Sequence, residues 1–469
     1  MGANLNSGTT SDPGLDTLVA DPPPTAAARR GGLLAVPDDE APATLEGQAP
    51  RSLGLLDQLG LWGNLGVSLL GFTGAIVVLA PAGAQPMSVP AALTALVVGS
   101  VLGALILGTT LLMGARTGAP AMVVLRGVLG GRASYAPTVL NIAQCLGWGV
   151  FELVVIAESA RALSDDALPR WVCVVGAGAL TTLLTLRPLG AIRWLRRLLV
   201  PLVVLSLVVL AVGLLRRDTP AVTGGSWGGF WLAVDAVIAL SLSWVPLAAD
   251  YSRHSRTPRA AFAGGAVGYS VAQIACMGLG VVALLQVQLE GDVFALFRTL
   301  ALGTAALAVL TVRETDQSFA NVYSTAVSLQ NLAPRLDRRV LTVAIGALIT
   351  AGALWLKFDS YDDFLYAIGG FFVPLSGVMI AAWVGRRGAW DTSVDAPTRV
   401  GMLLAWLAGF VAYQLVNPGS LPGWSGLWTS AGEALHTLGQ PWLSASVTSF
   451  AVAALIAWPF TRRAAATQG

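Results

Sequence analysis

Charge, cysteine and histidine are all scarce in this sequence. Only 12% of its 469 residues are charged and the formal net charge is +2, which is too small to predict binding to nucleic acid. The cysteines Cys145, Cys173 and Cys276 lack metal-ligand spacing, so no disulfide, zinc site or other structural metal is predicted. The two histidines, His254 and His436, lie near expected membrane boundaries, and no HExxH, GxSxG or P-loop pattern occurs. We therefore expect neither enzymatic activity nor a cofactor.

Hydrophobic residues dominate instead. They make up 55% of the chain, and the mean hydropathy is +0.69. A water-soluble protein of this size cannot bury such a fraction inside one core. Repeated apolar runs approach the roughly 20 residues that cross the hydrocarbon of a bilayer as a helix, and the alternation typical of a barrel is absent. The composition predicts an all-α polytopic membrane protein with about twelve spans.

The first apolar stretch, residues 59–81, is expected to be a genuine span and not a signal peptide. The residues before it are rich in Pro, Ala, Gly, Thr and acidic groups, without a charged segment that leads into an apolar one. We expect residues 1–56 to form a disordered cytoplasmic tail. Further spans are expected to centre near Gly99, Cys145, Gly178, Leu205, Leu240, Ala275, Thr315, Ile345, Phe372, Leu407 and Ala453.

Arginines are unequally divided between alternate loops. One set of loops carries Arg116, Arg126, Arg132, Arg187, Arg193, Arg196, Arg197, Arg253, Arg256, Arg259, Arg335, Arg338, Arg339, Arg386 and Arg387. The intervening loops hold Arg161, Arg170 and Lys357 beside Asp165, Asp166, Asp359, Asp362 and Asp363. By the positive-inside rule, the chain is a multi-pass protein of the cell membrane, plasma or inner, with both termini in the cytoplasm.

Two spans contain matched interruptions, at residues 70–75 of the first and 241–246 of the sixth. Glycine and proline there release backbone groups from the helix, and such groups persist in hydrocarbon only where protein, water or a ligand binds them. Carriers built from inverted repeats form a site at the membrane midplane in this way. The alternative is ordinary close packing of small residues.

The third span carries a polar stripe. Gln144, Trp148 and Glu152 follow one another at intervals of four and so share one helix face. An indole, an amide and a carboxylate together suit a flat heterocycle that stacks on the ring and forms hydrogen bonds at its edge. Alternatively, Trp148 packs against a neighbour and Glu152 pairs with an arginine.

The eighth span is the most polar. Near its expected centre lie Arg313, Glu314, Thr315, Asp316, Gln317, Ser318 and Asn321. One face carries Glu314, Gln317, Ser318 and Asn321, while Thr315 and Asp316 point elsewhere and offer oxygens to a cation. An ion pair of Arg313 with Glu314 or Glu152 is also expected, even if the site is functional.

Two further carboxylates in the sixth span, Asp235 and Asp250, each allow more than one interpretation. Asp235 in the sixth span is either a proton carrier or a solvated group near the outer boundary. For Asp250, at the cytoplasmic end of the same span, a helix-end cap or a loop ion pair is the favoured interpretation.

At these positions the sequence resembles the nucleobase:cation symporter-1 family, the purine and cytosine permeases and their relatives for hydantoin, allantoin and hydroxymethylpyrimidine. The resemblance extends over residues 62–387. Its motifs are Leu70-Gly71-Phe72-Thr73, Arg116-Thr117-Gly118-Ala119-Pro120 with Leu125-Arg126, Gly147-Trp148, Ala249-Asp250-Tyr251-Ser252-Arg253, Thr315-Asp316-Gln317, Asn321-Val322-Tyr323-Ser324, and Pro374 with Gly377.

The resemblance implies a LeuT-type fold with two inverted repeats of five helices and two extra helices. Residues 57–217 would form the first repeat and 226–387 the second. Residues 398–462 would hold the last two spans, and 463–469 a cytoplasmic tail. The family's function implies a symporter that imports a nucleobase or related planar heterocycle by alternating access, coupled to Na+ or H+.

The resemblance also implies a site between broken helices one and six and intact helices three and eight. The implied substrate-binding residues are Ala75, Gln144, Trp148, Glu152, Ser241, Ser243, Trp244, Gln317 and Asn321. The implied coupling-cation residues are Gly71, Gly74, Thr315 and Asp316. Two positions depart from the family: Glu152 replaces an amide and favours a donor-rich substrate edge, and Asp316 replaces a hydroxyl, which leaves Na+ and H+ both open.

The sequence is also consistent with other functions. One is a LeuT-type carrier of an amino acid or another small solute, and a second is a channel or a membrane sensor. An intramembrane enzyme is disfavoured because no nucleophile and base pair is recognisable. We expect a monomer in a lipid bilayer with a small-molecule substrate. The sequence leaves open which base is carried and what Glu152, Arg313, Glu314 and Asp316 each do.

Overall fold

A computed structural model describes residues 41–45, 47, 49–81, 86–220, 226–289, 291–355, 361–386, 388, 390–419, 423–440 and 442–462. The expected tails at 1–40 and 463–469 lie outside these ranges, as do Lys357, Asp359 and Arg387 of the loop-charge argument. Within the described ranges the chain is helical, and its β pairing is a single bridge between Leu53 and Ser255.

The first half of the described chain forms α1 (Leu55–Leu65), α2 (Leu69–Thr73), α3 (Ile76–Leu79), α4 (Val89–Thr117), α5 (Ala121–Val124), α6 (Arg126–Leu129), α7 (Tyr135–Leu163), α8 (Arg170–Leu186), α9 (Pro188–Trp194), the π-helix η1 (Leu195–Leu199) and α10 (Val200–Leu215). The second half forms α11 (Phe230–Leu242), α12 (Val245–Ser252), α13 (Pro258–Ala263), the π-helix η2 (Gly264–Tyr269), α14 (Ser270–Gln286), α15 (Val293–Arg298), α16 (Gly303–Leu332), α17 (Arg338–Trp355), α18 (Tyr361–Gly385), α19 (Val400–Val416), α20 (Ser425–Ala434) and α21 (Ala445–Arg462).

Many of these helices have the length and composition of membrane spans. Seven helical segments in the described ranges are long and apolar enough to cross a bilayer, and the bent pair formed by α1 with α2 and α3 makes up to eight. The apolar helices α8, α19 and α21 are shorter, and α16 is long but rich in buried polar residues. The expected span centres lie in these helical segments. The number of segments that cross the membrane, about twelve, stays a prediction.

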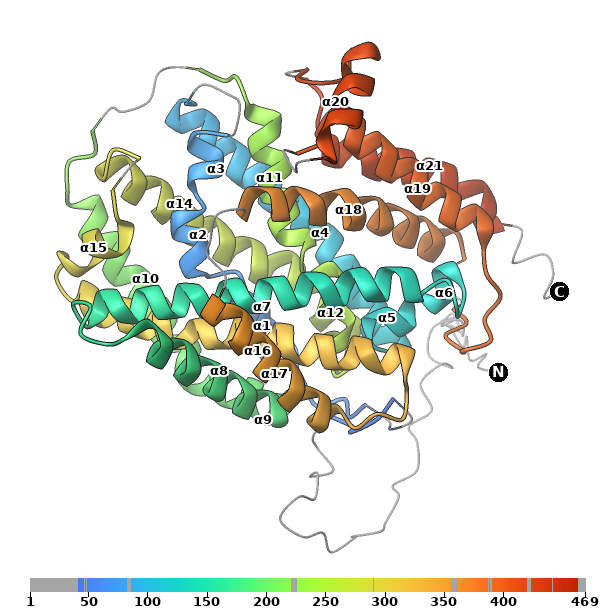
Figure 1. The fold of residues 1–469 in the computed structure, drawn as a ribbon, viewed down its shortest axis with the longest axis horizontal. Helices are drawn as coiled ribbons and strands as arrows, with labels where there is room; N and C mark the ends of the chain where they lie inside the picture. Colours follow the sequence, from blue (N-terminus) through green and yellow to red (C-terminus); the bar gives the residue numbers. More distant parts are fainter. Residues whose placement is uncertain are drawn as a thin grey trace, which may run out of the picture. The chain divides into compact units, whose positions relative to one another are not determined.

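Helices far apart in sequence lie side by side. Helix α7 packs along α16, and α4 packs along α11 (Figure 1). At Gly103 of α4 a Cβ atom would lie 2.6 Å from the Cβ of Ser241 on α11, so only glycine permits this approach. Helices α18, α19 and α21 pack on one another in the orange and red part of the chain. The polar faces of α7 and α16 are thereby buried against each other.

The first span is interrupted twice, once inside the predicted stretch and once before it. Gly74 and Ala75 separate α2 from α3 within residues 70–75. Helix α1 ends at Leu65 and α2 begins at Leu69, so Gly66, Val67 and Ser68 form the break, and the helices on its two sides are bent by 52°. The interruption at residues 70–75 was predicted, whereas the sharper break about one helical turn earlier was not. The backbone packs closely at this earlier break, since a Cβ atom at Gly66 would lie 2.6 Å from the carbonyl oxygen of Tyr269.

The sixth span is interrupted within the predicted stretch. Helix α11 ends at Leu242 and α12 begins at Val245, which leaves Ser243 and Trp244 between them. The Ser243 hydroxyl donates to the carbonyl oxygen of Leu240 at 2.7 Å. The Ser243 carbonyl accepts from the side chain of Gln144 at 3.0 Å. The neighbouring helix α7 thus binds the backbone group that the interruption releases.

The end of the expected disordered tail packs against the body of the protein. Leu53 is fully buried, its N–H donates to His254 O at 2.9 Å, and its carbonyl accepts from Arg256 N at 2.8 Å. Further upstream, Ala43 O accepts from the side chain of Gln330 and from the backbone of Arg338. The prediction of disorder up to residue 56 is wrong for this segment, because its backbone hydrogen bonds go to the helices rather than to water.

Candidate functional site

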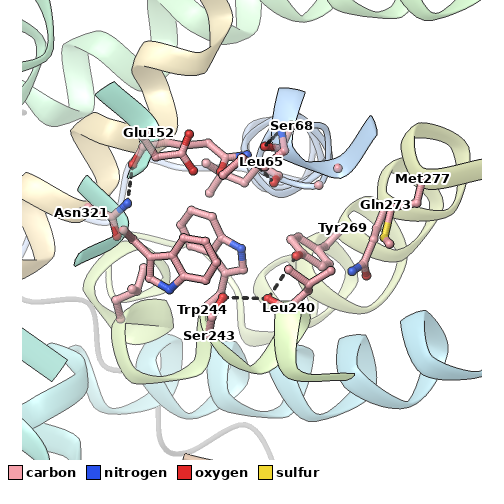
Figure 2. Close-up of a pocket in the computed structure, with 16 residues that line it drawn as sticks. Leu65, Ser68, Glu152, Leu240, Ser243, Trp244, Tyr269, Gln273, Met277 and Asn321 are labelled. Atoms are coloured by element: carbon pink, nitrogen blue, oxygen red, sulfur yellow. Dashed lines mark hydrogen bonds between the residues drawn. The ribbon is translucent and has the colours of Figure 1, made fainter. Parts of the chain in front are cut away.

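A cavity lies where the broken first span meets α7, the α11–α12 interruption, α14 and α16 (Figure 2). It contains about 570 Å³ of space not filled by atoms, including space open to solvent. Figure 2 shows Glu152 and Asn321 at one end and Tyr269, Gln273 and Met277 at the other. Its lining consists of Leu65, Gly66, Ser68, Leu70, Gly71, Trp148, Glu152, Leu240, Ser243, Trp244, Leu247, Tyr269, Gln273, Met277, Gln317 and Asn321.

Two indole rings line the cavity from different helices. Trp148 comes from α7, and its ring lies edge-on to Phe364 with centroids 5.3 Å apart. Trp244 comes from the α11–α12 interruption and lies edge-on to Trp62 with centroids 6.2 Å apart. These aromatic contacts fix the planes of both rings. The cavity therefore offers preoriented aromatic surface to a flat ligand.

Glu152 is the carboxyl group on the cavity wall. It comes from α7, one turn after Trp148, and is only 2% exposed. Among the described residues, its Oε2 atom has no hydrogen-bond partner. Glu152 also interacts electrostatically with Glu314, Arg313 and Asp316 on α16. A buried carboxyl oxygen without a donor is costly, so the cavity wall has unused acceptor capacity at this position.

The amides of α16 border the cavity but bind protein. Gln317 donates its side-chain N–H groups to Leu65 O at 3.1 Å and to Val67 O at 2.9 Å. Asn321 donates to the Gln317 carbonyl oxygen at 3.1 Å. Gln317 thus replaces the helical hydrogen bonds that the α1–α2 break has lost. Its first role is to hold the break, although it also faces the cavity.

The structure brings together six of the nine residues predicted to bind substrate. The six that line the cavity are Trp148, Glu152, Ser243, Trp244, Gln317 and Asn321. The other three, Ala75, Gln144 and Ser241, are not part of the lining. Ala75 is buried, with its Cβ against Gly280 of α14. Gln144 binds the α11–α12 interruption, and Ser241 donates to Gln273 at 3.0 Å.

The predicted cation residues are also dispersed. Gly71 borders the cavity, whereas Gly74 does not. The Thr315 hydroxyl donates to Val312 O at 2.7 Å within its own helix. Asp316 accepts from Asn64 and forms an ion pair with Arg313. No group of three or more His, Cys, Asp and Glu side chains suited to a metal ion occurs in the part of the chain that the structure describes.

Sequence reasoning missed the contribution of the seventh span. Tyr269 at the end of η2 and Gln273 and Met277 of α14 line the cavity. The Gln273 side chain accepts from Ser241, and the Tyr269 hydroxyl donates to Leu240 O at 3.4 Å. A signal for them exists, because Tyr269 and Gln273 are polar-tipped residues spaced by four in an otherwise apolar stretch.

The buried Asp235 caps a helix and is not solvated. It is 1% exposed, and it accepts from Ser444 Oγ at 2.5 Å, Ala445 N at 2.8 Å and Ser446 N at 3.0 Å. These donors lie at the N-terminus of α21, where a negative charge is favourable. The interpretation of Asp235 as a solvated group is therefore wrong, because its carboxylate joins α11 to α21, and the interpretation as a proton carrier stays a prediction.

Replacing Asp235 with alanine should lower stability and leave transport intact. Loss of a helix cap costs about 0.5–2 kcal/mol of unfolding free energy, and thermal unfolding of the purified protein measures that cost. The exposed Asp391 provides a matched control, since Asp391→Ala should leave the unfolding midpoint nearly unchanged. A folded Asp235→Ala protein that had lost gradient-driven uptake would support the proton-carrier interpretation.

Several motifs that carry the family resemblance lie outside the cavity and hold helix ends together. Asp250 Oδ1 accepts from the N–H of Ala121 at the start of α5, at 2.8 Å. Tyr251 donates to Ala320 O at 3.0 Å, and Arg253 donates to the Tyr323 hydroxyl at 3.0 Å. The Asp250 motif thus fastens α12 to α5 and α16. This agrees with the helix-end role favoured for Asp250.

A sequence comparison matches residues 70–399 to a family described as permeases for cytosine/purines, uracil, thiamine and allantoin. The matched residues make up well over half of the chain. A comparison with curated proteins gives no match.

Solved structures share the fold. One is Mhp1, a nucleobase-cation-symport-1 family transporter, in a closed conformation with bromovinylhydantoin bound; the TM-score is 0.68 at 18% identity, over 92% of this chain and 96% of Mhp1. The inward-facing conformation of Mhp1 matches with a TM-score of 0.63 at 17% identity, over 92% and 94% of the two chains. A Na+-coupled sialic acid symporter in an outward-open state matches with a TM-score of 0.60 at 11% identity, over 90% and 92%.

Proposed function

Because the chain belongs to the family of permeases for cytosine/purines, uracil, thiamine and allantoin, we propose that it imports a planar nitrogen heterocycle with a donor-rich edge. Cytosine and other aminopyrimidines have such an edge. Transport is coupled to a cation and proceeds by alternating access. The observation that carries the proposal is the pairing of preoriented indole rings with the carboxyl group of Glu152 in one cavity.

The chemistry of the cavity favours this class of substrate. The faces of Trp148 and Trp244 stack on a flat ring, whereas an aliphatic solute gains no such geometry. The Glu152 carboxyl group offers acceptor oxygen at the cavity wall, so it favours exocyclic amino and ring N–H groups. Asn321 and Ser243 supply further polar contacts at the rim of the ring.

The broken first span supports a transport cycle. Gln317 holds the carbonyls of the α1–α2 break while it also borders the cavity, so ligand and break share one side chain. A ligand that binds more tightly to one arrangement of the break shifts the population toward that arrangement. Carriers of inverted-repeat architecture rock one helix bundle against the rest around such a site. Ser243 and Trp244 likewise belong both to the cavity lining and to the interruption of the sixth span, so a ligand that contacts them also acts on that interruption.

The setting of this cycle follows from the loop charges. The arginine-rich loops belong on the cytoplasmic side, which places both termini there with an even number of spans. We propose that the protein is a multi-pass protein of the cell membrane. We propose that it works as a monomer.

A panel of labelled bases tests the proposed function. Cells that express the full chain should accumulate cytosine or another aminopyrimidine above the level of cells without it, and the accumulation should collapse with the ion gradients. The panel includes uracil, hypoxanthine, hydroxymethylpyrimidine, allantoin and an amino-acid mixture. Uptake of amino acids but of no planar base would contradict the substrate class.

A further inference from the structure

A buried arginine lies at the break in the first span. Arg313 of α16 is 0% exposed, and its guanidinium donates to the backbone carbonyl of Asn64, in the last turn of α1. It also approaches the Asn64 side-chain oxygen at 3.4 Å. The carbonyl end of a helix carries partial negative charge and attracts a cation. In this protein the attracted cation is a side chain of the protein itself.

The same guanidinium pairs with two carboxylates. Its Nη1 lies 3.0 Å from Glu314 Oε2, and its Nη2 lies 3.4 Å from Asp316 Oδ1. Glu314 in turn accepts from Ser68 Oγ at 2.6 Å and from Leu69 N at 3.0 Å, at the beginning of α2. Asp316 accepts from the side chain of Asn64. One ion-pair network of α16 therefore binds both sides of the break. The positive Arg313 binds the carbonyl end of α1, and the negative Glu314 binds the N–H end of α2.

This network uses the oxygens that a small cation would need. Carbonyls released by a broken helix, together with carboxylates, are the ligands that hard cations prefer. Here Asn64 O accepts from Arg313, and Leu65 O and Val67 O accept from Gln317. A sodium ion at this break would have to displace a guanidinium from two carboxylates, and the like charges would repel each other.

We propose that Arg313 is a built-in cation that takes the place of a coupling sodium ion at the break between α1 and α2, so that the transporter works without sodium. Other groups near the guanidinium are Glu152 from α7 and Cys276 from α14, and neither adds a positive charge. Of the two coupling ions that the sequence leaves open, the proton then remains. The inference rests on the proposed transport function, because only a transporter has a coupling ion, but its test requires no substrate.

Binding of radioactive sodium to the purified full-length protein tests the proposal directly. The wild-type protein should show no saturable 22Na+ binding, whereas a sodium-coupled transporter run in parallel should show it. Arg313→Ala leaves two carboxylates and the Asn64 carbonyl without their cation, so this variant should gain saturable 22Na+ binding. Free guanidinium ion at non-denaturing concentration should compete with that binding. Saturable binding to the wild-type protein would overturn the proposal.

Two further variants separate this role from a merely structural one. Arg313→Lys keeps a positive charge and should bind no sodium, which also covers the case in which the alanine variant does not fold. Arg161→Ala removes an arginine from surface ion pairs with Glu158 and Asp166 and should behave like the wild type. Sodium binding to Arg313→Lys at wild-type stability would contradict the proposal. If no base in the uptake panel is transported, the proposed function fails while the sodium result stands on its own.

Discussion

Replacing Trp148 with alanine is expected to weaken binding of the transported base by roughly 5- to 150-fold, because stacking of a base on an aromatic ring contributes about 1–3 kcal/mol. Trp148 lines the cavity, and its contact with Phe364 fixes the plane of its ring. Isothermal titration of the detergent-solubilised protein with cytosine, or with whichever base the uptake panel identifies, measures the change.

The Trp148 experiment has a matched control on a neighbouring helix. Trp171 of α8 is 62% exposed, so Trp171→Ala makes the same substitution away from the cavity and should leave affinity unchanged. Trp148→Phe keeps an aromatic face and should retain part of the affinity. If Trp148→Ala binds the base as tightly as the wild type does, Trp148 is not the stacking residue.

Replacing Glu152 with glutamine should change which base is preferred. Glutamine places an amide donor where a carboxyl oxygen accepted, and a buried donor left without a partner costs about 1–3 kcal/mol, so binding of cytosine should weaken by roughly 5- to 150-fold. Glutamine supplies both a donor and an acceptor, so binding of uracil should weaken less or improve. Competition of each base against labelled substrate gives the ratio of the two affinities.

Stability distinguishes this effect from damage to the fold. Glutamine keeps the size of the Glu152 side chain and can form a hydrogen bond with the neighbouring Glu314, so Glu152→Gln should not lower the unfolding temperature. Glu158→Gln is the matched control on the same helix, since Glu158 is half exposed and pairs with Arg161 and Arg170. An unchanged ratio of cytosine to uracil affinity in Glu152→Gln would remove Glu152 from the binding site.

Part of the cavity lining could be predicted from helical spacing. Trp148 and Glu152 are four residues apart, as are Gln317 and Asn321, and each pair lines the cavity as predicted. Spacing succeeds here because α7 and α16 are regular helices, in which side chains four apart lie on one face. The same rule does not apply where the helix is irregular. It therefore gave no sign of the break between Leu65 and Leu69 in the first span.

The sequence by itself determined that this is a helical membrane protein of the permease family, with polar stripes on the third and eighth spans. Apolar run length and side-chain periodicity are local properties of the chain, so they can be recognised without knowing which helices pack together. Only the tertiary structure decided that the break lies at Gly66–Ser68, that Asp235 caps α21, and that Arg313 binds the carbonyl of Asn64. Those facts depend on which helix end meets which side chain across about 250 residues of sequence, and such pairings are set by packing in three dimensions.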